Sequence, residues 1–269
     1  MDNSHNPLVS IIVATKNEQA RLPHLCLSIA KQNYTNIETI IVDNYSTDDT
    51  LILAKRFTQK VYLHGTERSQ QRNYGAKKSE GKYLLYLDAD MELHPGTVGE
   101  CIEVISRQNS QALIIPETNN GTNFFSRIKR LEKKLYLNES SIESPRFFSK
   151  KIFMQVGGYD ERLIAGEDWD LGKRVSIQGK ISRINRPLVH NENSFFREIE
   201  HKLYYTKHIA KYHKKHQAVF SEQSGFKRLF IFLTKKTFYT EDPPASIGLL
   251  FVKSIEFFLY CLARLYASI

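Results

Sequence analysis

The chain has 269 residues, a formal net charge of +9 and a hydrophobic fraction of 41%, which is enough for a globular domain with a sizeable core. Cys26, Cys101 and Cys261 are widely spaced and form no Cys-x-x-Cys pattern, so neither a zinc site nor a disulfide framework is expected. Residues 1–6 are polar and lack the apolar centre of a secretory signal, which predicts a cytoplasmic protein.

Short apolar runs alternate with helical patterns over the first ninety residues. The runs predict strands at residues 9–14, 37–42, 61–63 and 82–87, and the intervening stretches predict helices at 21–33, 49–58 and 68–79. Strands that alternate with helices favour a parallel sheet with right-handed crossovers. The sequence therefore predicts an α/β fold.

Polar side chains follow three of these strands. Thr15-Lys16-Asn17-Glu18 follows the first, Asp43 to Thr50 follows the second, and Asp88-Ala89-Asp90 follows the fourth. Open α/β sheets bind ligands at the carboxyl ends of their strands. Two carboxylates there suit Mg²⁺ or Mn²⁺ carrying a phosphorylated substrate. The alternative is that Asp88 caps a turn and Asp90 is solvated.

A second acidic motif comes after the predicted sheet strands. Gly157-Gly158 permits a tight turn, and Glu167-Asp168 then opens a helix that runs through Val175. Acids in a first helical turn are favoured by the helix dipole, so helix capping is the alternative to a catalytic role. Between the two motifs, residues 117–145 predict a loop with a basic helix near 126–137. Pro145-Arg146-Phe147-Phe148 either contacts a donor sugar or begins the next strand.

The C-terminal part is basic and aromatic. Between residues 197 and 236 there are ten Lys and Arg residues but three Glu, interleaved with Tyr and Phe. This mixture suits anionic lipid headgroups or a polyanionic acceptor, and because no nucleic-acid module is recognisable, nucleic acid is not an expected partner.

Residues 247–269 are mostly apolar and long enough to span a bilayer. However, Lys253, Glu256, Tyr260 and Arg264 share one helical stripe, which favours a helix lying in the membrane interface. The alternative is that the apolar face packs onto the protein, together with residues 226–239.

Four motifs in order give the chain a recognisable likeness. Residues 9–18, Val42 to Thr50, Gln71-Arg72-Asn73-Tyr74-Gly75-Ala76 and Leu87 to Asp90 resemble glycosyltransferase family 2 over roughly residues 8–190. The resemblance implies the GT-A fold, a Rossmann-like, mixed and mostly parallel sheet flanked by helices. It divides the chain into a catalytic domain at 1–195 and a helical C-terminal region at 196–269, which we expect to associate with a membrane.

The resemblance also implies roles for individual residues. Thr15, Asn17, Glu18 and Ser46 would hold the nucleoside, while Asp43 would accept a hydrogen bond from the uracil imide. Arg72, assisted by Arg68, would lie near the base and diphosphate. Asp88 and Ala89 would contact the ribose or a metal-bound water, Asp88 and Asp90 would face the metal, and His190 would contact the metal or diphosphate, unless it is structural. Asp168 would be the base, with Glu167 and Asp170 orienting the acceptor or a neighbouring cation.

The activity implied is inverting transfer of a hexosyl or N-acetylhexosaminyl group from a nucleoside-diphosphate sugar, expected to be a UDP-sugar, with Mn²⁺ or Mg²⁺. The expected acceptor is a saccharide hydroxyl on a lipid-linked glycan, at the inner face of the membrane. Two alternatives are transfer to polyprenyl phosphate, which needs no base, and a non-catalytic sugar-nucleotide-binding protein. A nucleotidyltransferase is disfavoured, because no Gly-rich loop with Lys and Arg follows Val13.

Overall fold

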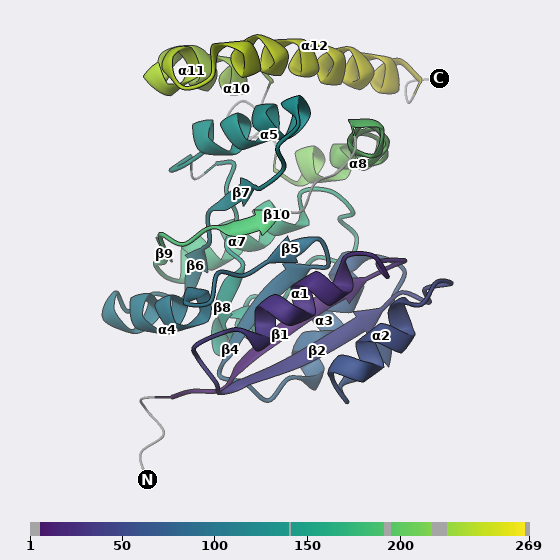
Figure 1. Ribbon diagram of the computed structural model, residues 1–269, viewed down its shortest axis with the longest axis vertical. Coiled ribbons are helices and arrows are strands. Elements are labelled where there is room, and N and C mark those ends of the chain that lie inside the picture. Colours follow the sequence, from purple (N-terminus) through teal and green to yellow (C-terminus); the bar gives the residue numbers. More distant parts are fainter. Residues whose placement is uncertain (1–5, 140, 191–194, 217–224, 267–269) are drawn as a thin grey trace. The chain divides into compact units, whose positions relative to one another are not determined.

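A seven-stranded mixed sheet organises the first part of the chain (Figure 1). The computed structural model describes residues 6–139, 141–190, 195–216 and 225–266. The chain forms two compact units. Unit 1 comprises residues 1–117, 144–162 and 167–190, and unit 2 comprises residues 118–143, 163–166 and 191–269.

Unit 1 alternates strands and helices, and each element expected before residue 90 begins and ends within three residues of its predicted position. Its elements are β1 (Val9–Thr15), α1 (Leu22–Ala30), β2 (Ile37–Asp43), α2 (Thr50–Phe57), β3 (Val61–Leu63), α3 (Arg68–Lys78), β4 (Tyr83–Asp88), β5 (Met91–Glu92), α4 (Thr97–Arg107), β6 (Ala112–Ile114), β8 (Phe147–Ser149), α6 (Lys150–Gln155), α7 (Glu167–Gln178), β9 (Ile181–Arg183) and β10 (Leu188–His190). The strand β7 (Glu117–Asn119) begins at the last residue of the first segment of unit 1.

The strand order of the large sheet is β3-β2-β1-β4-β8-β6-β9. β3, β2, β1 and β4 run parallel, and β6 pairs in parallel with β9. Only β8 runs against its neighbours β4 and β6. This confirms the expected mixed, mostly parallel sheet.

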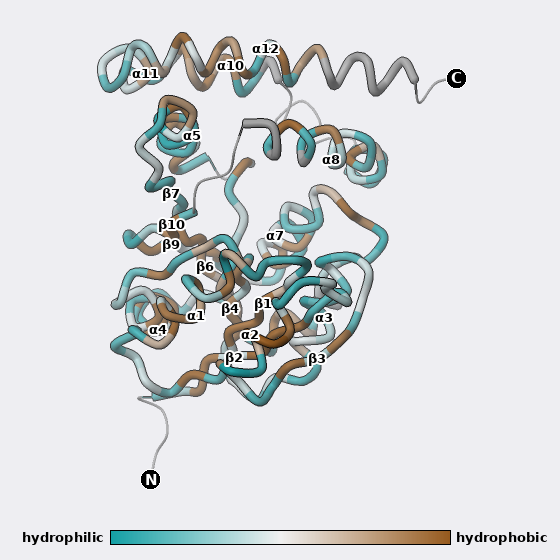
Figure 2. Tube along the Cα trace, turned by 45° about the vertical axis from the view of Figure 1, so that its right-hand side comes forward, coloured by the Kyte–Doolittle hydropathy of each residue, from teal (hydrophilic) through white to brown (hydrophobic). Residues whose placement is uncertain are grey.

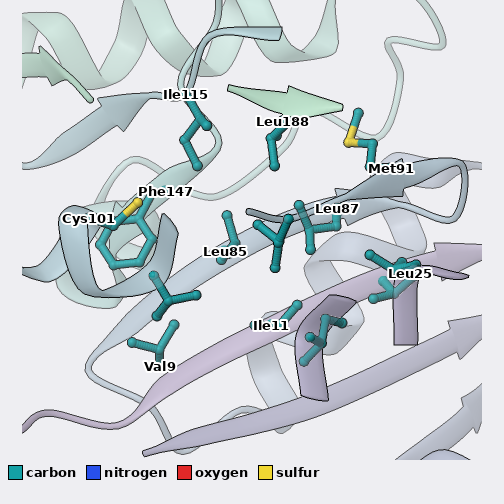
Figure 3. Packing of buried hydrophobic residues seen from close by; sticks show 14 of the residues in the cluster. Val9, Ile11, Leu25, Leu85, Leu87, Met91, Cys101, Ile115, Phe147 and Leu188 are labelled. Carbon is teal, nitrogen blue, oxygen red and sulfur yellow. The ribbon is translucent and has the colours of Figure 1, made fainter. Parts of the chain in front are cut away.

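Both faces of the sheet are covered by helices, which explains why its central strands are continuous apolar runs. On β1, Ile11 and Val13 point to the side packed by α1, α2 and α4, whereas Ile12 points to the side packed by α3, α6 and α7. Figure 3 shows the first of these cores, with side chains of β1 and β4 meeting those from α1 and α4. In Figure 2 the central strands are accordingly brown, the colour of apolar residues.

The described part of unit 2 is mainly helical. It contains α5 (Phe124–Leu135), α8 (Phe195–Lys215), α10 (Gly225–Thr234), α11 (Lys236–Thr240) and α12 (Pro243–Tyr266). The Asn123 side chain caps α5 by accepting a 2.8 Å hydrogen bond from the Ser126 amide. α12 packs on α5 and α8, and its buried Leu249 and Val252 share a core with α5, α10 and α11.

Two charged residues of α12 face other helices of the unit. Lys253 is paired with Glu132 of α5 and, at 2.7 Å, with Glu256, while Lys202 of α8 lies 3.9 Å from Glu256. The side chains of Tyr260 and Arg264, which belong to the same predicted stripe, lie outside the described residues. In the described part of the chain, no helix combines the length and apolarity needed to cross a membrane.

Candidate active site

Three strands of unit 1 end in polar side chains at the same edge of the sheet. The parallel register places Thr15 of β1 opposite Asp43 of β2, and Ala14 of β1 opposite Asp88 of β4. The chain makes these residues neighbours because parallel strands present their carboxyl ends together. The predicted convergence of the three polar clusters is thus a consequence of strand register.

Asp43 is fully buried and closely bonded within this edge. Its carboxylate accepts hydrogen bonds from the Thr15 hydroxyl at 2.8 Å and from the Ser46 amide and hydroxyl at 2.7 and 2.6 Å. A carboxylate has about four lone-pair sites, so one acceptor position remains beyond these three bonds. The hydrogen bond from a uracil imide to Asp43 stays a prediction. It would use the fourth acceptor position of the carboxylate.

The loops that follow β1 and β2 are bonded to each other through the other predicted nucleoside-binding residues. The Asn17 amide donates to the Ser46 hydroxyl at 2.8 Å, and the Asn17 side-chain oxygen accepts from the Thr47 amide at 2.9 Å. The Glu18 amide donates to the Thr50 hydroxyl at 2.7 Å. Asn17 has a φ of 54° and Tyr45 a φ of 49°, a left-handed conformation that a bulky aromatic residue rarely adopts. The structure therefore brings Thr15, Asn17, Glu18, Asp43 and Ser46 together.

Arg72 of α3 joins the two acidic motifs. Its guanidinium donates to Asp88 Oδ1 at 2.5 Å and to Glu167 Oε1 at 3.4 Å, and Arg68 donates to the same Glu167 oxygen at 3.1 Å. Arg72 is only 3% exposed, which is incompatible with a solvated helix face. Ninety-five residues separate Arg72 from Glu167 in the chain, so this contact unites motifs that the sequence keeps far apart.

A second arginine binds the other oxygen of Asp88. Arg146, just before β8, donates to Asp88 Oδ2 at 3.3 Å and, through Nε, to Glu117 Oε1 at 2.8 Å. Burial acts to raise the pKa of Asp88, but the charges of Arg72, Arg146 and Arg68 outweigh it and hold that pKa well below its usual range. Asp88 is therefore an ionised carboxylate with both oxygens engaged by arginine.

Asp90 and His190 lie side by side at the antiparallel pairing of β5 with β10. The register sets His190 opposite Met91, the residue after Asp90, and the His190 Nδ1 lies 3.8 Å from Asp90 Oδ2. Burial would raise the pKa of Asp90, but the hydrogen bond and charge of His190 lower it. Ala89, between the two acids, is buried and offers only its backbone to a ligand.

These donors fit a cation that is shared with a substrate. Asp90 and His190 supply one oxygen and one nitrogen, whereas Asp88 is occupied by arginine. Mg²⁺ and Mn²⁺ commonly keep one or two protein ligands and complete their shell with water and phosphate oxygens. Among the described residues, no group of three or more His, Cys, Asp or Glu side chains is arranged to hold a metal ion. The metal assignments of Asp88, Asp90 and His190 remain predictions.

The first turn of α7 carries three acids in different surroundings. Glu167 is buried against Arg68 and Arg72, and burial together with the charge of Asp168 raises the pKa of Glu167 despite those arginines. Asp170 is fully buried and paired with Arg174, one helical turn further on, at 2.7 Å. Asp168 is half-buried and accepts a 2.9 Å hydrogen bond from the Trp169 amide. Asp168 is thus the most exposed carboxylate of this turn.

Sequence reasoning missed Glu117 and left the role of Arg146 open. Glu117 Oε2 lies 3.0 Å from His190 Nε2, so it links His190 to Arg146. No motif marks Glu117, which follows a short apolar strand and Pro116 in a segment expected to be a loop. A charged residue next to a strand end was the one available signal.

Comparisons with known proteins agree with this arrangement. A model of glycosyl transferase family 2 matches residues 10–159. An uncharacterised glycosyltransferase of Haemophilus influenzae is 27% identical over 199 residues, which cover 68% of this chain and 67% of that protein. The Staphylococcus aureus poly(ribitol-phosphate) β-N-acetylglucosaminyltransferase TarS is 30% identical over 115 residues, which cover 39% of this chain but only 20% of TarS.

Two solved structures are similar in fold. TarS residues 1–349 in complex with UDP-GlcNAc align with a TM-score of 0.60 and 20% identity over 90% of this chain and 79% of that chain. The mannosyltransferase PcManGT from Pyrobaculum calidifontis, in complex with GDP-Man and Mn²⁺, aligns with a TM-score of 0.65 and 16% identity over 98% of this chain and 81% of that chain. These likenesses confirm the GT-A fold.

Proposed function

The chain belongs to glycosyl transferase family 2, and from that premise we propose that this glycosyltransferase moves a sugar, with inversion, from a UDP-sugar to a hydroxyl of a saccharide acceptor carried on a lipid. The contact that carries this proposal is the one Arg72 makes to both Asp88 and Glu167. It holds Asp88 of the predicted donor site and Glu167, the chain neighbour of the predicted base Asp168, within one bonded network. An enzyme needs both in one place, because the donor and the acceptor react with each other.

We assign the base to Asp168. In an inverting transfer the acceptor hydroxyl attacks the anomeric carbon from the side opposite the leaving nucleoside diphosphate, and a carboxylate takes the hydroxyl proton. Glu167 and Asp170 are bound to arginines, whereas Asp168 is the more exposed acid of the turn.

The protein's own cations help to hold the donor diphosphate. Arg68 is partly exposed beside Glu167, and Arg72 and Arg146 fix Asp88 in its ionised form. Asp90 and His190 would hold a divalent cation, which would offset the negative charge that develops on the departing diphosphate. We assign the nucleoside to the loops that carry Thr15, Asn17, Glu18, Asp43 and Ser46.

The donor assignment draws on the solved neighbours. TarS is seen with UDP-GlcNAc, which supports a uracil nucleotide and an N-acetylhexosamine, and PcManGT is seen with GDP-Man, which supports a guanine nucleotide and a hexose. We favour the UDP-sugar because TarS is the more similar of these two neighbours in sequence, at 20% against 16% identity. Release of free sugar from a panel of UDP- and GDP-sugars, with and without Mn²⁺, would identify the donor.

The variant Asp168→Asn tests the base. It should keep UDP binding within about twofold and lower turnover by on the order of 10²-fold or more, because an amide cannot take the hydroxyl proton. Asp160→Asn, which changes an acid paired with Arg162 in the same unit, is the matched control and should leave turnover unchanged. Full activity in Asp168→Asn would remove the base assignment and favour an acceptor that is already anionic, such as a polyprenyl phosphate.

We further propose that unit 2 binds the surface of an anionic membrane at its cytoplasmic face. Three large apolar side chains of α12 lie on the face opposite its buried Leu249 and Val252. Ile247, Phe251 and Phe258 are 72%, 67% and 62% exposed. They follow one another at helical spacing, so they form one apolar stripe. The excess of basic over acidic residues at 197–236 supports anionic lipid as the partner of that stripe.

A further inference from the structure

Glu117 lies at a branch point of the charge network, although the chemistry proposed above gives it no direct part. Its Oε1 accepts a 2.8 Å hydrogen bond from Arg146 Nε, and its Oε2 lies 3.0 Å from His190 Nε2. Arg146 continues to Asp88 at 3.3 Å, and His190 continues to Asp90 at 3.8 Å. One carboxylate thus stands behind both acids of the Asp88-Ala89-Asp90 motif.

We propose that Glu117 is a positioning residue that holds His190 in the Nε2–H tautomer and so prepares His190 and Asp90 to share a divalent cation. The inference rests on the proposed function, since the cation is the one that would accompany the sugar nucleotide. It assigns no proton transfer to Glu117. Glu117 orients the His190 ring and the Arg146 side chain.

The tautomer follows from the hydrogen-bonding capacity of the two groups. An ionised carboxylate only accepts hydrogen bonds, so a neutral imidazole that faces Glu117 through Nε2 must carry its proton there. In a neutral ring the Nδ1 atom, 3.8 Å from Asp90 Oδ2, then keeps a lone pair that can bind a cation. A carboxylate behind a histidine is the usual way in which proteins orient a metal-binding imidazole.

The separation of the two donor atoms is compatible with one ion. Two atoms that each lie about 2.1 Å from the same Mg²⁺ are at most about 4.2 Å apart. The Asp90 Oδ2 and His190 Nδ1 atoms, at 3.8 Å, are within this limit but about 0.8 Å farther apart than neighbouring ligands of an octahedral ion, so binding of an ion would draw them together. The β5–β10 pairing fixes both backbones, so the side chain of Glu117 decides only the ring orientation and the tautomer.

The arginine branch explains why the acid is Glu rather than a neutral residue. Arg146 is mostly buried, and burial acts to lower its pKa, but the charges of Glu117 and Asp88 outweigh this and raise it. Removing the charge at position 117 would leave Arg146 with Asp88 as its remaining acidic partner among these groups. Arg146 would then pair more strongly with Asp88, the other acid of the Asp88-Ala89-Asp90 motif.

The first measurement is the ¹⁵N spectrum of histidine-labelled, metal-free protein at about pH 8.5, where an ordinary imidazole is neutral. The signal of His190 is assigned by its absence in His190→Gln. We expect wild type to show the Nε2–H tautomer, and Glu117→Ala to show a mixture of both tautomers. Glu117→Gln keeps the shape of the side chain and serves if the alanine variant does not fold.

The second measurement is Mn²⁺ binding in the presence of UDP, followed by electron paramagnetic resonance of the free ion. Loss of an outer partner of a metal-binding histidine typically lowers affinity by about 10–100-fold, and we expect a rise in the Mn²⁺ Kd of this size in Glu117→Ala and a smaller rise in Glu117→Gln. Glu100→Ala is the matched control. Glu100 is equally well bonded, to Arg186 and to the Asn185 amide, and its loss should leave the Mn²⁺ Kd unchanged.

Either of two results overturns the inference. One is a wild-type tautomer in both Glu117 variants, and the other is an unchanged Mn²⁺ Kd or no Mn²⁺ binding by wild type. Neither measurement needs sugar transfer. A wild type that shows the expected tautomer and Mn²⁺ binding, yet transfers no sugar from any donor tested, would count against the proposed function and leave the role of Glu117 standing.

Discussion

Arg72 shows how a single residue can make a buried site stable and useful at once. A guanidinium that is 3% exposed would be costly without partners, and here Asp88 and Glu167 each contribute a carboxylate while the Tyr159 ring lies 5.2 Å from its centre. The planar fork of an arginine can reach both acids in fixed directions, which a lysine cannot. The same residue therefore stabilises α3 against α7 and fixes the acids for chemistry.

This arrangement predicts that replacing Arg72 lowers the free energy of unfolding much more than replacing Arg68 on the same helix. Arg72→Gln should lower the free energy of unfolding by about 3 kcal/mol, because it leaves two buried carboxylates without their shared cation. Arg68→Gln, at a position 38% exposed, should cost no more than about 1 kcal/mol. Urea unfolding at neutral pH measures both. Equal losses in the two variants would contradict the bridging role of Arg72.

At the scale of the element, α3 must come close to the sheet for Arg72 to reach Asp88. Gly75, one turn after Arg72, makes this approach possible. A Cβ atom at position 75 would lie 2.5 Å from Ile12 Cγ2, inside the van der Waals contact distance. The glycine in the Gln71-Arg72-Asn73-Tyr74-Gly75-Ala76 motif is therefore a packing requirement of the sheet and not a flexible point in the helix.

Two glycine substitutions test this requirement. Gly75→Ala should destabilise the protein by about 1–3 kcal/mol through overpacking against Ile12, and it should weaken UDP binding by displacing Arg72. Gly99→Ala, on α4, should instead stabilise it by about 0.5–1 kcal/mol, because nothing lies within 4 Å of the added methyl group. Thermal unfolding and calorimetric titration with UDP report the two effects. A stabilised Gly75→Ala would show that the helix does not need this close approach.

Helix α12 shows what helical periodicity in the sequence cannot predict, namely which face of the helix is covered. The helical repeat correctly grouped Lys253 with Glu256 on one stripe. It did not reveal that Glu132 and Lys202 on other helices would pair with that stripe, which leaves the apolar Ile247, Phe251 and Phe258 exposed. Which face of an amphipathic helix is covered depends on the helices packed against it.

At the scale of the whole molecule, the proposed attachment to a membrane can be measured on the full chain. The variant Ile247→Ser/Phe251→Ser/Phe258→Ser should reduce binding to vesicles of phosphatidylglycerol and phosphatidylcholine at least tenfold, since each side chain contributes apolar area to the lipid contact. Ile177→Ser, which removes an exposed isoleucine from α7, is the matched control. Equal co-sedimentation of the triple variant and wild type, or none by wild type at low salt, would exclude this surface as the lipid contact.

Local sequence determined much of this protein. The apolar runs, the alternation of strands and helices and the polar residues after each strand were sufficient to predict β1 to β4, α1 to α3 and the edge of the sheet where Thr15, Asp43 and Asp88 meet. These features depend on hydrophobic period and on strand direction, which are properties of contiguous residues. The acids at 88, 90, 167 and 168 were predicted from their positions after a strand and in a first helical turn, together with the family resemblance, and their roles stay predictions.

Only the tertiary structure decided which charges bind one another. Arg72 could have been solvated, Arg146 could have been no more than the start of a strand, and Glu117 carried no signal at all, yet these residues form one network between segments up to 95 residues apart. Ion pairs depend on distance in space and on burial, and neither quantity is present in a linear order of residues. For that reason the sequence could predict the acids of the candidate site, whereas the fold supplied their partners.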